Sequence, residues 1–150
     1  MTTADFYGDG HLDLAVTNQG DDTVSVLRGH RDGTFSPAVN YAVGPAPTGI
    51  IAADVNGDGH PDLVTANFGF CGGGGMSILV NNGDGTFGAP ITYTSIPNAH
   101  AVYAGDFDQD GRLDLVAVSQ SQNVAAVLRG NGDGTFGPPQ TFSVGAGRWA

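Results

Sequence analysis

The middle of the chain reads Asp54-Val55-Asn56-Gly57-Asp58-Gly59-His60-Pro61-Asp62-Leu63, and the same arrangement of aspartates and glycines occurs again at residues 5–14 and 106–115. A second marker, Asp-Gly-Thr-Phe, follows each copy, at residues 32–35, 84–87 and 133–136. The first marker recurs after 49 and then 52 residues, and the second after 52 and then 49. Three copies of one unit therefore fill the 150-residue chain, and this repeat determines the architecture.

Each repeat contains four short apolar stretches separated by turn residues. In the second copy these stretches are residues 50–53, 63–66, 76–80 and 90–94. Glycine, aspartate and asparagine lie between them, which is typical of hairpins. Four short strands in about 50 residues match the size of a β-propeller blade. We therefore predict an all-β fold of three four-stranded antiparallel blades, at residues 1–49, 50–101 and 102–150.

The composition supports an all-β protein and excludes several functions. All 15 acidic residues are Asp, all 5 basic residues are Arg, and 25 residues are Gly, so the usual helix formers Glu and Lys are missing. A net charge of -10 leaves no basic surface to neutralise phosphates, so we expect no nucleic-acid partner. No apolar run is long enough for a membrane span. No catalytic motif is present, and we expect a protein that is not an enzyme.

The aspartate-rich segment, with the form Asp-x-(Asp/Asn/Tyr)-x-Asp-Gly-x-x-Asp, carries the chemistry. Alternate oxygen ligands on a tight loop suit a hard cation that takes six to eight oxygens, so we predict Ca²⁺. The glycine in the sixth position of each copy permits the sharp turn, and the seventh residue is expected to contribute its main-chain carbonyl. The alternative is a metal-free turn stabilised by Asp side chains. The predicted ligands are Asp5, Asp9, His11 and Asp13 in the first copy, Asp54, Asn56, Asp58, His60 and Asp62 in the second, and Asp106, Asp108, Asp110, Arg112 and Asp114 in the third.

Over its whole length the chain resembles FG-GAP or VCBS-type repeats, the blades of integrin-alpha-like propellers. In that family the aspartate loop joins the first two strands of a blade and binds calcium, which implies the same role for the aspartates named above and for Asn56. Tyr7 departs from the pattern, because the family has Asp or Asn there and a phenol is a poor ligand. Counting carboxylates predicts the strongest site in the third copy and the weakest in the first.

The resemblance implies adhesion, ligand binding or sugar binding. We expect an extracellular adhesion, assembly or protein-binding scaffold whose export signal lies outside these 150 residues. Two alternatives are a carbohydrate-binding propeller, for which Trp149 is the candidate contact, and a non-catalytic fragment of a larger secreted enzyme. A bound extracellular protein or glycan is a corresponding partner.

The repeat also predicts self-assembly. Three blades cannot close a propeller, which typically has four to eight. Residues 144–150 followed by residues 1–5 align without a gap against residues 43–54, so a second copy would continue the repeat. We predict two chains in a six-bladed head-to-tail ring, with residues 1–14 of one chain against residues 123–150 of the other. A longer array and an open stack are the alternatives.

Overall fold

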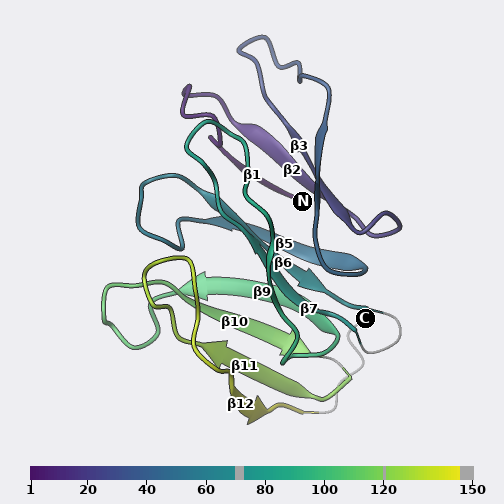
Figure 1. Ribbon diagram of the computed structural model, residues 1–150, viewed down its shortest axis with the longest axis vertical. Coiled ribbons are helices and arrows are strands. Elements are labelled where there is room, and N and C mark those ends of the chain that lie inside the picture. Colours follow the sequence, from purple (N-terminus) through teal and green to yellow (C-terminus); the bar gives the residue numbers. More distant parts are fainter. Residues whose placement is uncertain (70–72, 120, 146–150) are drawn as a thin grey trace.

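The structure, a computed structural model, describes residues 1–69, 73–119 and 121–145 (Figure 1). The described residues form strands and no helix, and so nothing in them could cross a membrane as a helix. The strands are β1 (Thr2–Ala4), β2 (Asp13–Asn18), β3 (Thr23–Leu27), β4 (Val39–Ala42), β5 (Pro47–Ala53), β6 (Asp62–Asn67), β7 (Gly75–Leu79), β8 (Ile91–Tyr93), β9 (Ala99–Gly105), β10 (Asp114–Ser119), β11 (Val124–Leu128) and β12 (Gln140–Ser143).

The strands form three sheets, each with its four strands in chain order. The sheets are β1-β2-β3-β4, β5-β6-β7-β8 and β9-β10-β11-β12, and every pairing is antiparallel. The prediction of three four-stranded antiparallel blades is confirmed, although the first strands of the second and third blades begin a few residues before the predicted residues 50 and 102, at Pro47 and Ala99. Figure 1 shows the blades stacked in chain order, the first at the top, in an arc that does not close into a ring.

The burial of equivalent strands follows the stacking. β6 and β7, in the middle blade, are buried at every position. In the first blade, β3 and the first four residues of β2 alternate between buried and half-buried positions, and the end of β2 is half-buried. Side chains along a strand alternate between the two faces of the sheet, so the middle blade is covered on both faces and the first blade mainly on one. This accounts for the continuous apolar runs in the second repeat.

Two apolar clusters join the blades, and we call each contact between neighbouring blades a joint. The cluster between the first two blades contains Phe6, Val24, Val26, Leu63 and Phe87, and the cluster between the last two contains Val55, Val64, Ile78, Leu115 and Phe136. The ring of Phe6 meets that of Phe87, in the Asp-Gly-Thr-Phe marker of the next blade, and Val55 shares a cluster with Phe136, in the marker of the third blade. The stacking of blades, rather than the interior of any one sheet, therefore forms the core.

Trp149, the candidate sugar contact, and Cys71, the single cysteine of the sequence, lie outside the described residues. Nothing in the structure therefore bears on the sugar contact predicted for Trp149.

Candidate metal centre

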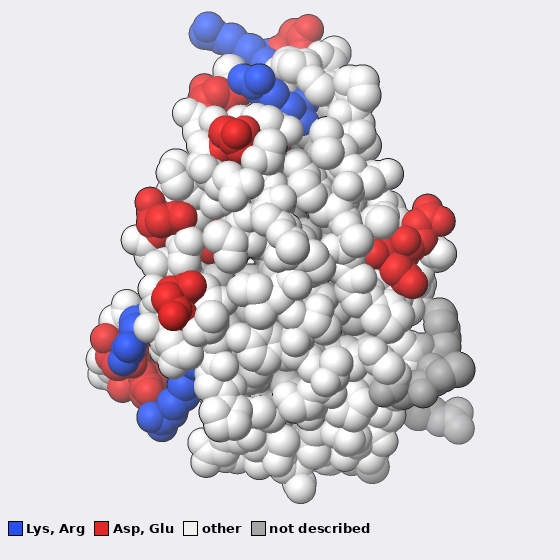
Figure 2. Space-filling model, in the orientation of Figure 1, with Lys and Arg blue, Asp and Glu red and all other residues white. Residues whose placement is uncertain are grey.

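The three aspartate-rich segments connect the first and second strands of their blades. We call them loop 1 (residues 5–13), loop 2 (residues 54–62) and loop 3 (residues 106–114). All three loops project from the same edge of the stack (Figure 1), and Figure 2 shows acidic side chains along that edge, with arginines near its top and its bottom. The stack therefore places one acidic loop per blade on a single side.

The ninth residue of each loop is a buried aspartate that ties the loop to the sheet. Asp13 accepts hydrogen bonds from the backbone N–H groups of Phe6 and Gly29, both at 2.8 Å. Asp62 and Asp114 make the equivalent pairs of bonds, at 2.8–3.0 Å, and all three side chains are buried. Each carboxylate thus bridges the start of its loop and the end of the third strand. This structural role is compatible with metal binding, because a carboxylate oxygen has a second lone pair.

The first residue of each loop shapes the turn. Asp5 accepts hydrogen bonds from the N–H groups of Asp9 and Gly10 at 3.0 and 2.7 Å, and the first aspartates of loops 2 and 3 bind the same two positions. The predicted turn at the sixth position is confirmed, since the glycines there have φ angles of 82°, 88° and 85°. The fourth position is also left-handed: loops 1 and 2 place glycine there, whereas loop 3 holds Gln109 at φ 63°.

Loop 3 brings three carboxylates together. One oxygen from each of Asp106, Asp108 and Asp114 lies within 4.8 Å of the other two, whereas Asp110, also predicted as a ligand, is not part of this group. Arg129 approaches Asp108 at 3.1 Å, and Arg112 pairs with Asp110 at 2.7 Å. The Arg112 side chain, which is the larger cause, and its backbone N–H lower the pKa of Asp110. These convergent oxygens are the donor set that Ca²⁺ prefers.

Among the described residues, no arginine pairs with the aspartates of loop 2. Asn56 takes the third position, and its amide nitrogen donates to Asp58 at 2.8 Å. Burial raises the pKa of Asp62, and the negative charges of Asp58 and Asp54 raise it further. The concentration of acidic groups around a buried carboxylate would favour a bound cation. Loop 2 therefore carries donor types that suit Ca²⁺, but the structure does not bring its three carboxylates together as it does those of loop 3.

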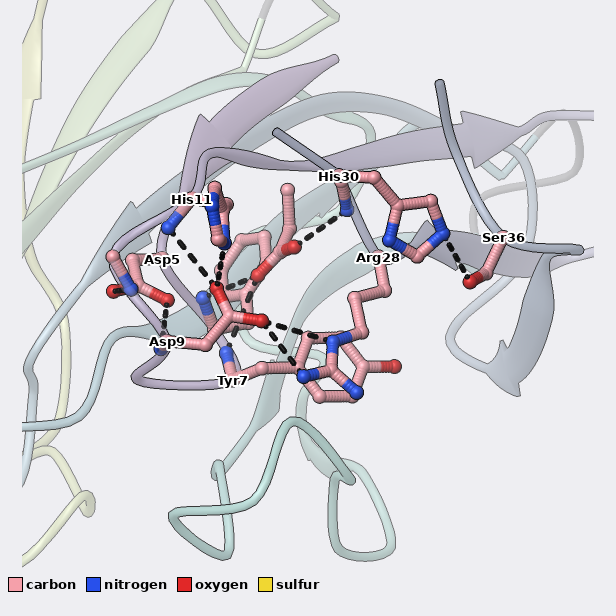
Figure 3. Close-up of polar contacts among 11 residues, drawn as sticks. Asp5, Tyr7, Asp9, His11, Arg28, His30 and Ser36 are labelled. Atoms are coloured by element: carbon pink, nitrogen blue, oxygen red, sulfur yellow. Dashed lines mark hydrogen bonds and ion pairs between the residues drawn. The ribbon is translucent and has the colours of Figure 1, made fainter. Parts of the chain in front are cut away.

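Loop 1 differs, because Tyr7 replaces the third oxygen ligand and an arginine occupies the loop (Figure 3). Arg28 donates two hydrogen bonds to one oxygen of Asp9, at 3.0 and 2.8 Å, while His11 binds the other oxygen. The hydrogen bond from Arg28 is the largest cause that lowers the pKa of Asp9 to about 2. Arg112 engages both oxygens of Asp110 in loop 3 in a similar way, so the feature that sets loop 1 apart is Tyr7. With a phenol in the third position, loop 1 lacks one oxygen ligand and is a poorer donor set for a divalent cation than loops 2 and 3.

The structure assigns several predicted residues a clear role and leaves others as predictions. The aspartates of the Asp-Gly-Thr-Phe markers stabilise turns: Asp32, Asp84 and Asp133 each accept hydrogen bonds from the N–H and hydroxyl of a threonine. The seventh residues, His11, His60 and Arg112, donate their N–H groups to the fifth aspartate. Their role as carbonyl ligands remains a prediction.

Sequence analysis did not find the role of Arg28, nor the hydrogen bonds by which the ninth aspartate of each loop attaches the loop to the sheet. Arg28 could have been found by aligning the repeats, because the position after the third strand holds Arg28, Val80 and Arg129 in the three copies. The role of the ninth aspartate could have been found from the Asp-Leu pair at the start of each second strand, where an acidic residue begins an apolar run.

The three sheets are stacked without closing into a ring, and in each an acidic loop joins the first two strands. This architecture is that of an incomplete β-propeller. A family model described as FG-GAP-like repeat matches residues 5–65, 54–117 and 106–150, and the chain belongs to this family. Each matched segment begins at one of the three loops.

Among solved structures, a chain from the Tc holotoxin pore of Photorhabdus luminescens is similar to this protein, with 24% identity and a TM-score of 0.51. The similarity covers 97% of this chain and 7% of that one, so the protein spans a small part of the length of this relative. At this level of identity the likeness shows the fold alone. No curated protein matches the chain.

Proposed function

We propose that the protein is a calcium-binding, non-catalytic β-propeller module that serves as an extracellular scaffold for adhesion, protein binding or assembly. The observation that carries the proposal is the convergence of three carboxylate oxygens in loop 3. Asp106, Asp108, Asp110 and Asp114 would hold the ion there, and Asp54, Asn56, Asp58 and Asp62 would hold it in loop 2. Bound calcium would neutralise the clustered carboxylates and cross-link the turn.

The expected affinity is that of extracellular modules, with a Kd of about 10⁻⁴ to 10⁻³ M. Calcium outside cells is abundant enough to fill sites of this strength, which supports an extracellular location. At a free calcium concentration 100 times the Kd, the folded state gains about 2.7 kcal/mol. For a chain of this length that gain raises the Tm by roughly 5–10 °C.

Thermal unfolding in calcium and in chelator tests the metal. We expect Asp106→Asn and Asp54→Asn each to reduce the calcium-dependent rise in Tm. Asp21→Asn is the matched control, because it removes the same charge from an exposed residue outside the loops. An identical Tm in calcium and in chelator for the unsubstituted protein would refute calcium binding.

The scaffold part of the proposal is supported by exposed aromatic residues at the two ends of the stack. Their counterparts in the other blades are buried in the joints. Phe6 and Val55, which meet the next blade, are 0% and 2% exposed, whereas their counterpart in the third blade, Phe107, is 55% exposed. At the other side of the joint, Phe87 and Phe136 are each 7% exposed, whereas the first-blade counterpart Phe35 is 49% exposed. The third blade thus presents one half of a joint and the first blade presents the other.

The aromatic residue of the fourth strand is also packed in the joints of the first two blades and exposed in the third. Tyr41 meets Phe87 edge-to-face at 5.2 Å, and Tyr93 meets Phe136 at 6.2 Å. Their third-blade counterpart, Phe142, is 48% exposed. We propose that a second copy supplies Phe35 to Phe107 and Phe142, in a head-to-tail pair that completes six blades.

Light scattering with and without calcium tests this assembly. We expect the mass of two chains, and we expect Phe35→Ser or Phe107→Ser to reduce it to that of one. Leu12→Ser is the control, because Leu12 is also exposed but lies at a loop position that is not fully buried in any blade. A well-folded 15.2 kDa monomer at high concentration would refute the pairing, and a filament would replace the ring by an open stack.

A further inference from the structure

Arg28 occupies loop 1 in a way that no residue in the described part of the chain occupies loop 2. It follows β3 directly, and its Nε and Nη2 both donate to Oδ2 of Asp9, at 3.0 and 2.8 Å. Its guanidinium carbon lies 5.0 Å from the centre of the Tyr7 ring. Figure 3 shows the Arg28 side chain extending across the Tyr7 ring to the Asp9 carboxylate. A positive charge is therefore fixed within the acidic loop by an ion pair and by an aromatic face.

Tyr7 is itself held in place by the second blade. Gly85 lies against the tyrosine ring so closely that a Cβ atom on this glycine would come within 2.4 Å of a ring carbon. The carbonyl of the neighbouring Phe6 accepts a hydrogen bond from the Asn81 side chain at 3.0 Å. The packing of the second blade thus fixes the ring that supports Arg28. Loop 1, its arginine and the joint between the first two blades form one connected unit.

The other two repeats show what Arg28 changes. Val80 takes the position of Arg28 in the second blade, and Asn56 takes that of Tyr7. In the third blade Arg129 contacts Asp108, and its side chain is more exposed than that of Arg28. The fifth aspartate of that loop, Asp110, is held by Arg112 from within the loop, but an aspartate, Asp108, takes the place of Tyr7. Only in loop 1, among the described residues, do a tyrosine in the third position and an arginine on the fifth aspartate occur together.

We infer that Arg28 is the built-in cation of loop 1, so that the first blade and its joint with the second need no calcium. The inference rests on the proposed function, in which loops 2 and 3 bind the ion. The protein as a whole would then bind two calcium ions per chain rather than three.

Calcium stoichiometry by isothermal titration calorimetry tests the inference. We expect two ions per chain in the unsubstituted protein, and no loss of an ion on Asp5→Asn. The double variant Tyr7→Asn with Arg28→Val, which gives the first repeat the residues of the second at these two positions, should bind three ions. Arg31→Val with Tyr7→Asn is the control, because it removes an arginine of the neighbouring turn and leaves Arg28 in place. Binding of an ion in loop 1 of the unsubstituted protein, or no third ion in the double variant, would overturn the inference.

A second measurement does not depend on calcium. In chelator, Arg28→Val and Asp9→Asn should each lower the Tm, and the two together should lower it by less than the sum, because they remove the same ion pair. Arg31→Val should show no such coupling with Asp9→Asn. If no variant binds calcium, the proposed function fails, and the role of Arg28 is then decided by this coupling. Additive effects of Arg28→Val and Asp9→Asn would refute it.

Discussion

Removing the ring of Phe87 should destabilise the protein by about 3–5 kcal/mol, the usual loss for a buried Phe→Ala substitution. Phe87 is 7% exposed, and its ring meets those of Phe6 at 5.7 Å and Tyr41 at 5.2 Å, both edge-to-face. Aromatic pairs of this kind contribute about 0.5–1.5 kcal/mol each beyond their buried area. The loss would be a large part of a total stability that is typically about 5–15 kcal/mol.

Phe35→Ala is the matched control, because Phe35 holds the same position in the first blade but is half-exposed. Urea denaturation of dilute protein, at a concentration where single chains predominate, should give a loss below about 1 kcal/mol for Phe35→Ala. The midpoint for Phe87→Ala should fall much further, with an unchanged slope. Equal losses for the two substitutions in single chains would refute the view that the joints between blades form the core.

Three further predictions concern the loops. Asp62→Ala should cost roughly 2–6 kcal/mol by urea denaturation in chelator, because two buried backbone N–H groups lose their acceptor at about 1–3 kcal/mol each; a loss below 1 kcal/mol would contradict the tie. Gln109→Gly should raise stability by about 1 kcal/mol, since glycine adopts the φ of 63° without strain; a fall in Tm would contradict this. The pKa of Asp9 lies at about 2, below its ordinary 3.8, so the stability that it contributes is present above pH 3.8 and is lost as the pH falls towards 2. The difference in Tm between the unsubstituted protein and Arg28→Val should therefore shrink over that range, and a constant difference would exclude the ion pair as its cause.

The fold could be predicted from the sequence because the same turn chemistry occurs three times. One Asp-Gly-Thr-Phe marker could lie in any hairpin, but three at matched spacings fix the length of the unit and the ends of its strands. The four strands expected in the second copy match β5 to β8 to within a few residues. The largest difference is at β5, which begins at Pro47 rather than at residue 50, because its first residues pair with the end of β6 across an irregularity in register.

The loops were harder to predict, because a motif names residue types and not their partners. The pattern treats Asp9, Asp58 and Asp110 as equivalent, yet Arg28, Asn56 and Arg112 contact them in the three blades. Two of these partners belong to the same loop as the aspartate, whereas Arg28 lies 19 residues from Asp9. A contact over that distance follows from the strand pairing that brings the end of β3 beside loop 1. It therefore becomes visible only once the sheet is built.

The unequal burial of equivalent strands also has a consequence for backbone hydrogen exchange. Amides exchange when a region opens locally, and opening is rarest where most contacts must be broken. β6 and β7 are buried along their whole length, so their amides should exchange most slowly, and those of β3 and β11 should exchange faster although they occupy the same place in their blades as β7. A neighbour that covered the free face of the first or third blade would slow exchange in that blade towards the rate of the middle one. Exchange measured strand by strand would thus show which end of the stack a partner occupies.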